Sequence, residues 1–128
     1  MNLLLDTHVV IWAMVGSPKL TVSASAMLTD RRNALFVSAA TLWEVALKHD
    51  SKPDKIPVTA GQVEAYCRHC GIRQLPVRFN HALKVNSLAK LHADPFDRML
   101  IAQAMVEEMK LVSHDEDVIA YGDVVIPV

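Results

Sequence analysis

The stretch Asn2-Leu3-Leu4-Leu5-Asp6 places a short apolar run directly before a carboxylate, and it decides the fold class that we expect. An unbroken apolar run of this length is typical of a strand buried on both faces of a parallel sheet. Ala34–Val37 has the same character and is followed by Ser38, which is a good cap for a helix. Three further short strands are predicted at Ile72–Leu75, Leu111–Ser113 and Val124–Ile126.

Longer helical patterns lie between these strands, which is the alternation expected of βαβ units. We therefore expect an α/β fold in three layers, with a mainly parallel central sheet of about five strands and helices on both faces. The segment Asp50–Pro57 is polar and contains two prolines, so we expect an exposed loop there. The predicted helices are about Val22–Arg31, Ala39–Lys48, Thr59–His69, Phe79–Leu88 and Pro95–Met109.

Length and composition predict one domain over residues 1–128, because 128 residues is near the commonest domain size. Apolar residues make up 52% of the chain, which suggests that a partner or a second copy covers part of the surface. The apolar run Val9–Val15 is far shorter than the roughly 20 residues of a membrane helix, and no signal peptide is recognisable before it. We therefore expect a cytoplasmic protein with no membrane partner.

Net charge, cysteines and tryptophans are less informative. A formal charge of -1 neither supports nor excludes nucleic acid as a ligand. Cys67 and Cys70 flank His69, but a structural zinc site needs four ligands and no second pair follows at a suitable spacing. We interpret the cysteines as two reduced thiols on or near a helix. Trp12 and Trp43 stand among Ile, Leu and Val, and we expect both in the core.

Four acidic residues stand at positions where such a fold places its chemistry, and each also has a structural explanation. Asp6 and Asp115 follow predicted strands, at the edge where open α/β sheets bind ligands. Asp97 lies in the first turn of a predicted helix, with Asp94 before it as N-cap, so capping would explain both. Capping would equally explain Asp6 and Asp115. Glu44 lies in an apolar part of a helix, where Lys48 is a possible ion-pair partner.

These four acidic residues are more informative together than singly. A parallel sheet brings the carboxyl ends of its strands and the starts of the following helices to one edge, so the four carboxylates are expected to converge. Two carboxylates about 4 Å apart repel by roughly 4 kcal/mol at an effective dielectric of 20, so such a cluster must bind a cation or protons. Oxygen ligands select hard cations, which favours Mg²⁺ or Mn²⁺ over zinc. Hydrolysis of a nucleic-acid backbone is the reaction that such a site suits.

Four segments also carry a family resemblance, namely Asn2–His8, Val37–Glu44, Asp94–Ala104 and Leu111–Asp115. With these segments the sequence resembles the PIN-domain ribonucleases, specifically the VapC-type toxins of toxin-antitoxin pairs, over essentially its whole length. The third segment is the most specific. The resemblance implies a PIN-like three-layer sandwich and a Mg²⁺- or Mn²⁺-dependent endoribonuclease that cuts RNA.

The resemblance also assigns roles to the acidic residues. Asp6, Glu44 and Asp97 match the family's metal ligands, and Asp115, two places after a hydroxyl residue, matches a fourth, with Asp117 as an alternative. It further implies a cognate antitoxin protein that blocks the acidic site, and a homodimer. Thr7 and Arg98 are candidates for contacts to the metal-binding residues or to phosphate, although a surface position on the helix would explain Arg98 equally well. Cations expected to bind RNA, although a solvated surface would explain them too, are Arg31, Arg32, Lys48, Lys52 and Lys55.

Two other functions stay open. An aspartyl-phosphate phosphatase would use Asp6 as its nucleophile, but such enzymes usually carry a second Asp two residues later, where this chain has His8. A non-catalytic interaction module would keep the same fold without turnover.

Overall fold

The computed structural model describes the whole chain, from Met1 to Val128. Its five strands form one sheet in the order β3-β2-β1-β4-β5, and every neighbouring pair is parallel. The first strand is therefore the central one, and all strands end at the same edge. The strands are β1 (Asn2–Leu5), β2 (Ala34–Ser38), β3 (Arg73–Leu75), β4 (Lys110–Ser113) and β5 (Val125–Pro127).

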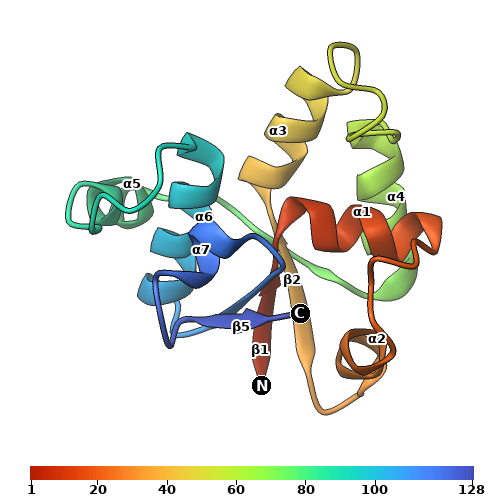
Figure 1. Cartoon of the computed structure of the whole chain (residues 1–128), viewed down its shortest axis with the longest axis horizontal. Coiled ribbons are helices and arrows are strands. Elements are labelled where there is room, and N and C mark those ends of the chain that lie inside the picture. The colour runs from red at the N-terminus through yellow and green to blue at the C-terminus, as the bar shows by residue number, and fades with distance from the viewer.

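Helices cover both faces of this sheet (Figure 1). In the figure, α5, α6 and α7 lie on one side of the strands, and α1, α2 and α4 lie on the other. The first residues of α3 pack in one layer and its later residues in the other. The helices are α1 (Thr7–Val15), α2 (Val22–Thr29), α3 (Ala39–Lys48), α4 (Ala60–Cys70), α5 (Phe79–Val85), α6 (Pro95–Val106) and α7 (Glu116–Ile119).

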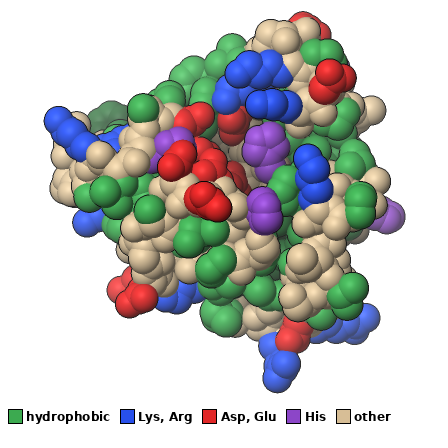
Figure 2. All heavy atoms as spheres, viewed as in Figure 1, with side chains coloured by type: hydrophobic (Ala, Val, Ile, Leu, Met, Phe, Trp, Pro, Cys, Tyr) green, Lys and Arg blue, Asp and Glu red, His purple; other side chains and the backbone are tan.

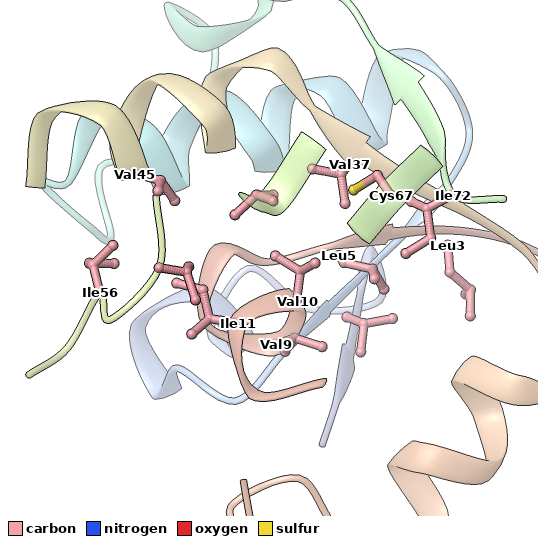
Figure 3. Close-up of a cluster of buried hydrophobic side chains, with 13 residues drawn as sticks. Leu3, Leu5, Val9, Val10, Ile11, Val37, Val45, Ile56, Cys67 and Ile72 are labelled. Atoms are coloured by element: carbon pink, nitrogen blue, oxygen red, sulfur yellow. The ribbon is translucent and has the colours of Figure 1, made fainter. Parts of the chain in front are cut away.

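The alternation of side chains along β1 divides the core into two parts. Leu3 and Leu5 point to one face, where they pack with residues of α1 and α4 in the cluster drawn in Figure 3. Leu4 points to the other face and packs with the buried side of α6, including Ile101. The three-layer α/β sandwich with a parallel central sheet is thus confirmed, and helices bury both faces of the sheet as parallel sheets require.

Two helices are absent from the sequence prediction. The first is helix α1, which is capped by Asp6 at its start and by Gly16 at its end, where Gly16 adopts the left-handed conformation with φ 65°. Between these caps it is apolar on all sides, so it lacks the periodicity that reveals an amphipathic helix. The second, α7, is a single turn.

Several helices end earlier in the structure than the sequence predicts. Instead of reaching Met109, α6 ends at Val106, because Glu108 adopts a left-handed φ of 55° and the Met109 N–H returns to the carbonyl of Ala104. Similarly, α2 ends at Thr29 and α5 at Val85. None of the helices is long and apolar enough to cross a membrane.

The predicted core positions of the two tryptophans are wrong. Trp43 is 62% exposed, because the buried side of α3 is formed by Ala40, Thr41, Glu44 and Val45. Trp12 is half-buried and lies outside both core clusters, with the ring of His114 5.3 Å away. Local apolar composition indicates a helix, but it does not fix which side chain faces outward.

Candidate metal centre

A polar cleft of about 200 Å³ opens at the carboxyl edge of the sheet. Figure 2 shows acidic side chains gathered at the centre of this face, with histidines beside them and basic side chains above them. The four carboxylates singled out from the sequence all line this cleft, although they come from four separate segments. The lining residues are Asp6, His8, Glu44, Lys48, Lys52, Lys55, Ile56, His92, Asp94, Asp97 and Asp115.

Asp6 ends the central strand and is only 4% exposed. Its Oδ1 accepts the N–H of Thr7 at 2.7 Å, and its Oδ2 accepts the hydroxyl of Ser113, at the end of β4, at 2.6 Å. Burial raises the pKa of Asp6, and these two hydrogen bonds partly oppose that rise. The residue is therefore both the cap of α1 and part of the cleft. Each oxygen keeps a further lone pair, so these hydrogen bonds orient Asp6 without preventing it from binding a cation.

Glu44 reaches the cleft from the buried side of α3. Its Oε1 accepts the hydroxyl of Thr7 at 2.7 Å, and its Oε2 accepts Nζ of Lys48 at the same distance. The Thr7 hydroxyl also lies 3.1 Å from that of Thr41. The ion pair with Lys48 considered from the sequence is thus present, but Glu44 is 4% exposed, so the pair lies within the cleft and not on an open surface.

Asp97 lies in the first turn of α6, where Asp94 caps the helix by accepting the N–H groups of Phe96 and Asp97. Burial and the negative charge of Asp6 raise the pKa of Asp97 to about 7. His92 Nε2 lies 2.7 Å from Asp97 Oδ2. This carboxyl group is therefore crowded by negative charge and has one basic partner.

Asp115 completes the acidic group from the N-cap of α7. One ligand atom from each of His92, Asp97 and Asp115 lies within 4.8 Å of the other two. Asp117, the alternative to Asp115, does not line the cleft, and its Oδ2 is 3.8 Å from His92 Nδ1. The geometry therefore favours Asp115 over Asp117.

His92 is the residue of this site that the sequence does not reveal, because it lies in an irregular segment between α5 and α6 without any periodic pattern. Arg98 fixes that segment: its guanidinium donates to the carbonyls of Val85, Ala89 and His92 at 3.1 to 3.4 Å. It also donates to the hydroxyl of Tyr121. Arg98 is thus engaged within the protein and does not offer a free group to phosphate, whereas Thr7 contacts Glu44 as expected of a supporting residue.

The basic residues divide into two groups. Lys48, Lys52 and Lys55 line the acidic cleft. Arg31 and Arg32 line a different cavity, between α2 and α4, and the exposed Arg32 is paired with the half-buried Asp30. Three of the five cations proposed for RNA binding therefore surround the acidic site, and two do not.

The donor atoms fit a hard divalent cation. Carboxylate oxygens predominate, which is the set that Mg²⁺ and Mn²⁺ prefer, and one imidazole nitrogen lies among them. The raised pKa values of Asp6 and Asp97 show that the protein alone does not fully compensate these buried charges. Neither cysteine lines the cleft: Cys67 is buried in α4, where burial raises its pKa to about 11, and Cys70 is exposed at the end of the same helix.

Comparisons with known structures agree with this architecture. A VapBC2 structure from Rickettsia felis, bound to a DNA fragment from its promoter, matches with a TM-score of 0.72 and 14% identity, covering 100% of this chain and 98% of the other. VapBC-1 from nontypeable Haemophilus influenzae matches with a TM-score of 0.65 and 18% identity over 94% and 92% of the two chains. A toxin-antitoxin complex from Klebsiella pneumoniae gives a TM-score of 0.63 and 14% identity over 96% and 94%. At these identities the structures establish a shared fold.

The sequence itself identifies the family. No curated protein matches the chain significantly. The family model described as PIN domain, however, matches residues 3–124, which include all seven helices and all four acidic residues of the cleft. The protein therefore belongs to the PIN domain family.

Proposed function

We propose that this protein is a metal-dependent endoribonuclease, the toxin component of a VapC-type toxin-antitoxin pair, and that it hydrolyses RNA with Mg²⁺ or Mn²⁺. The observation that carries the proposal is the convergence of Asp6, Glu44, Asp97 and Asp115 in one cleft. Membership of the PIN family and the shared fold with toxin-antitoxin complexes support the same function.

Two of the acidic residues are held in place by hydroxyl groups. Asp6 is oriented by Ser113, and Glu44 is oriented by Thr7. Such contacts hold the carboxylates of the cleft in place before a cation binds, which limits the reorganisation that binding requires. When bound, a divalent ion supplies positive charge beside a phosphodiester and lowers the pKa of a water molecule. The exposed Lys52 and Lys55 on the rim would attract the RNA backbone.

The test is cleavage of a panel of tRNA, rRNA and mRNA fragments with Mg²⁺, with Mn²⁺ and with chelator. Asp97→Asn is expected to lower the cleavage rate by at least about a hundredfold, because a metal ligand commonly contributes several kcal/mol. Asp123→Asn, at an exposed turn outside the cleft, is the matched control and should cleave normally. Equal cleavage by both variants would reject the proposal. A metal-induced rise in Tm without any cleavage would instead indicate an interaction module without turnover.

We also propose a cognate antitoxin as partner, and a surface groove supports this. A cavity of about 530 Å³ lies between α3, α5 and α6 and is lined almost entirely by apolar side chains, Trp43 and Phe96 among them. It lies beside the acidic cleft, since α6 begins next to both. An amphipathic peptide segment is the kind of ligand that such a groove accepts. Co-purification of the toxin with the product of an adjacent gene, lost in Trp43→Ser, would support this partner.

A homodimer is the second assembly that we propose. Phe79 and Leu83 are 92% and 70% exposed and lie four residues apart on one face of α5, and adjacent exposed apolar side chains are a mark of interaction surfaces. Light scattering of the purified protein should therefore give the mass of two chains. A mass of one chain would count against the dimer and leave the nuclease proposal unaffected.

A further inference from the structure

Lys48 places an ammonium group among the carboxylates of the cleft. Its Nζ donates to Glu44 Oε2 at 2.7 Å and lies 3.8 Å from Asp94 Oδ2. The Lys48 side chain is 26% exposed, so this is not a solvated surface lysine. The lysine therefore links α3 to the start of α6 across the cleft.

Contacts with aromatic and acidic side chains fix the position of the Lys48 ammonium group. Its Nζ lies 5.1 Å from the centre of the Phe96 ring, in a cation–π contact. Phe96 in turn packs edge-on against Trp43, with ring centres 5.2 Å apart. Asp94 uses its Oδ1 for capping α6, which leaves Oδ2 to face the ammonium group.

The other two lysines of the cleft differ from Lys48. Lys52 and Lys55 lie in the loop after α3, are exposed, and have no carboxylate within ion-pair distance. They serve as comparison residues, because they share the charge of Lys48 and line the same cleft without contacting its acidic groups.

The acidic groups thus fall into two halves. One half contains His92, Asp97 and Asp115, whose ligand atoms lie within 4.8 Å of one another, with the negative charge of Asp6 beside Asp97. The other contains Glu44, whose Oε2 accepts a hydrogen bond from the charged Nζ of Lys48, whereas Asp6 accepts only from the neutral Thr7 N–H and Ser113 hydroxyl. Nucleases that use two metal ions place them about 3.5 to 4 Å apart, between shared carboxylates.

We infer that the cleft takes a single divalent ion, in the half that contains His92, Asp97 and Asp115 with Asp6 beside them, and that the ammonium group of Lys48 occupies the place of a second ion beside Glu44. This inference rests on the proposed metal-dependent function and specifies how many ions that function uses. Lys48 is then a positioning residue, which neutralises Glu44 and holds it in the cleft. Glu44 contributes to the site as the partner of this fixed cation.

The test is the number of Mn²⁺ ions bound per chain, measured by calorimetry and by the electron paramagnetic resonance of Mn²⁺. The wild-type protein should bind one ion. Lys48→Met keeps an aliphatic chain against Phe96 but removes the charge, and it should bind two. Lys48→Arg, which keeps the charge, and Lys52→Met, which removes a charge outside the acidic group, should each bind one ion.

Two results would overturn the inference: two ions bound to the wild-type protein, or one ion bound to a folded Lys48→Met variant. If Lys48→Met does not fold, Glu44→Gln decides instead: it should leave the affinity for the single ion within about threefold, whereas Asp97→Asn should weaken it by at least about tenfold. Equal losses in both would make Glu44 a direct ligand and reject the inference.

These outcomes are separate from those of the nuclease test. If the protein cleaves RNA and binds two ions, the proposed nuclease function stands and the proposed role of Lys48 is rejected. If the wild-type protein binds one ion and Lys48→Met binds two, but no RNA is cleaved, the role of Lys48 stands and the nuclease function is rejected.

Discussion

Asp97 illustrates how a folded protein carries a charge that it stabilises poorly on its own. Burial and the neighbouring Asp6 raise its pKa to about 7, well above the ordinary value of 3.8. Its partner His92 is affected too: burial lowers the pKa of His92, but the hydrogen bond and the negative charge of Asp97 outweigh burial and raise it. Both groups therefore bind protons more tightly in the folded protein than in the unfolded chain.

A pH dependence of stability follows for the metal-free protein. Because the folded state holds more protons, stability from both groups is present at low pH and is lost as the pH rises, between about 4 and 7 for Asp97 and above 6.5 for His92. Asp97 accounts for at most about 4 kcal/mol of this change. In chelator, Tm should fall from pH 5 to pH 8, and Asp97→Asn should flatten the curve. Asp123→Asn should keep the wild-type slope, and identical slopes in all three proteins would contradict the assignment.

At the scale of secondary-structure elements, much of the fold is predictable from local signals. The strands β1 and β2 are short apolar runs, α3 begins at the Ser38 cap, and Asp94 caps α6 as the sequence indicates. The meeting of the carboxylates was also predictable, because parallel strands end at one edge. These inferences depend only on period, caps and topology.

The remaining features depend on tertiary packing. A helix that is apolar on all sides, such as α1, has no period to detect, and the outward position of Trp43 depends on how α3 turns toward its neighbours. His92 joins the site through Arg98, which holds this segment by hydrogen bonds to three backbone carbonyls. Backbone carbonyls are present at every residue, so no sequence pattern marks them as partners.

The segment between α5 and α6 should accordingly depend on Arg98. Arg98→Met removes hydrogen bonds to three carbonyls of residues 85–92, so amide hydrogen exchange in residues 86–94 should accelerate by at least about tenfold. Amides in the middle of α6 should be little affected. Arg68→Met removes an exposed pair with Glu64 on α4 and is the matched control. Unchanged exchange in residues 86–94 would show that packing alone holds the segment.

For the whole molecule, the cleft couples cation binding to folding. Four separate segments supply its carboxylates, so only the folded chain presents them together. Mg²⁺ at a hundred times its Kd should therefore stabilise the protein by about 2.7 kcal/mol. The measurement is Tm with Mg²⁺ against Na⁺ of equal ionic strength. Asp97→Asn should lower the difference by at least about half, and a wild-type Tm insensitive to Mg²⁺ and Mn²⁺ would refute a cation site in the cleft.

The hydrogen bond between Asp6 and Ser113 joins residues that are 107 positions apart, and the central strand β1 needs β4 as one of its two neighbours. During synthesis, β1 and Asp6 leave the ribosome long before their partner has been translated. A growing chain therefore lacks an assembled acidic cleft until β4 has emerged, since such distant pairings form late. The nuclease that we propose would therefore acquire its acidic cleft only near the end of its own translation.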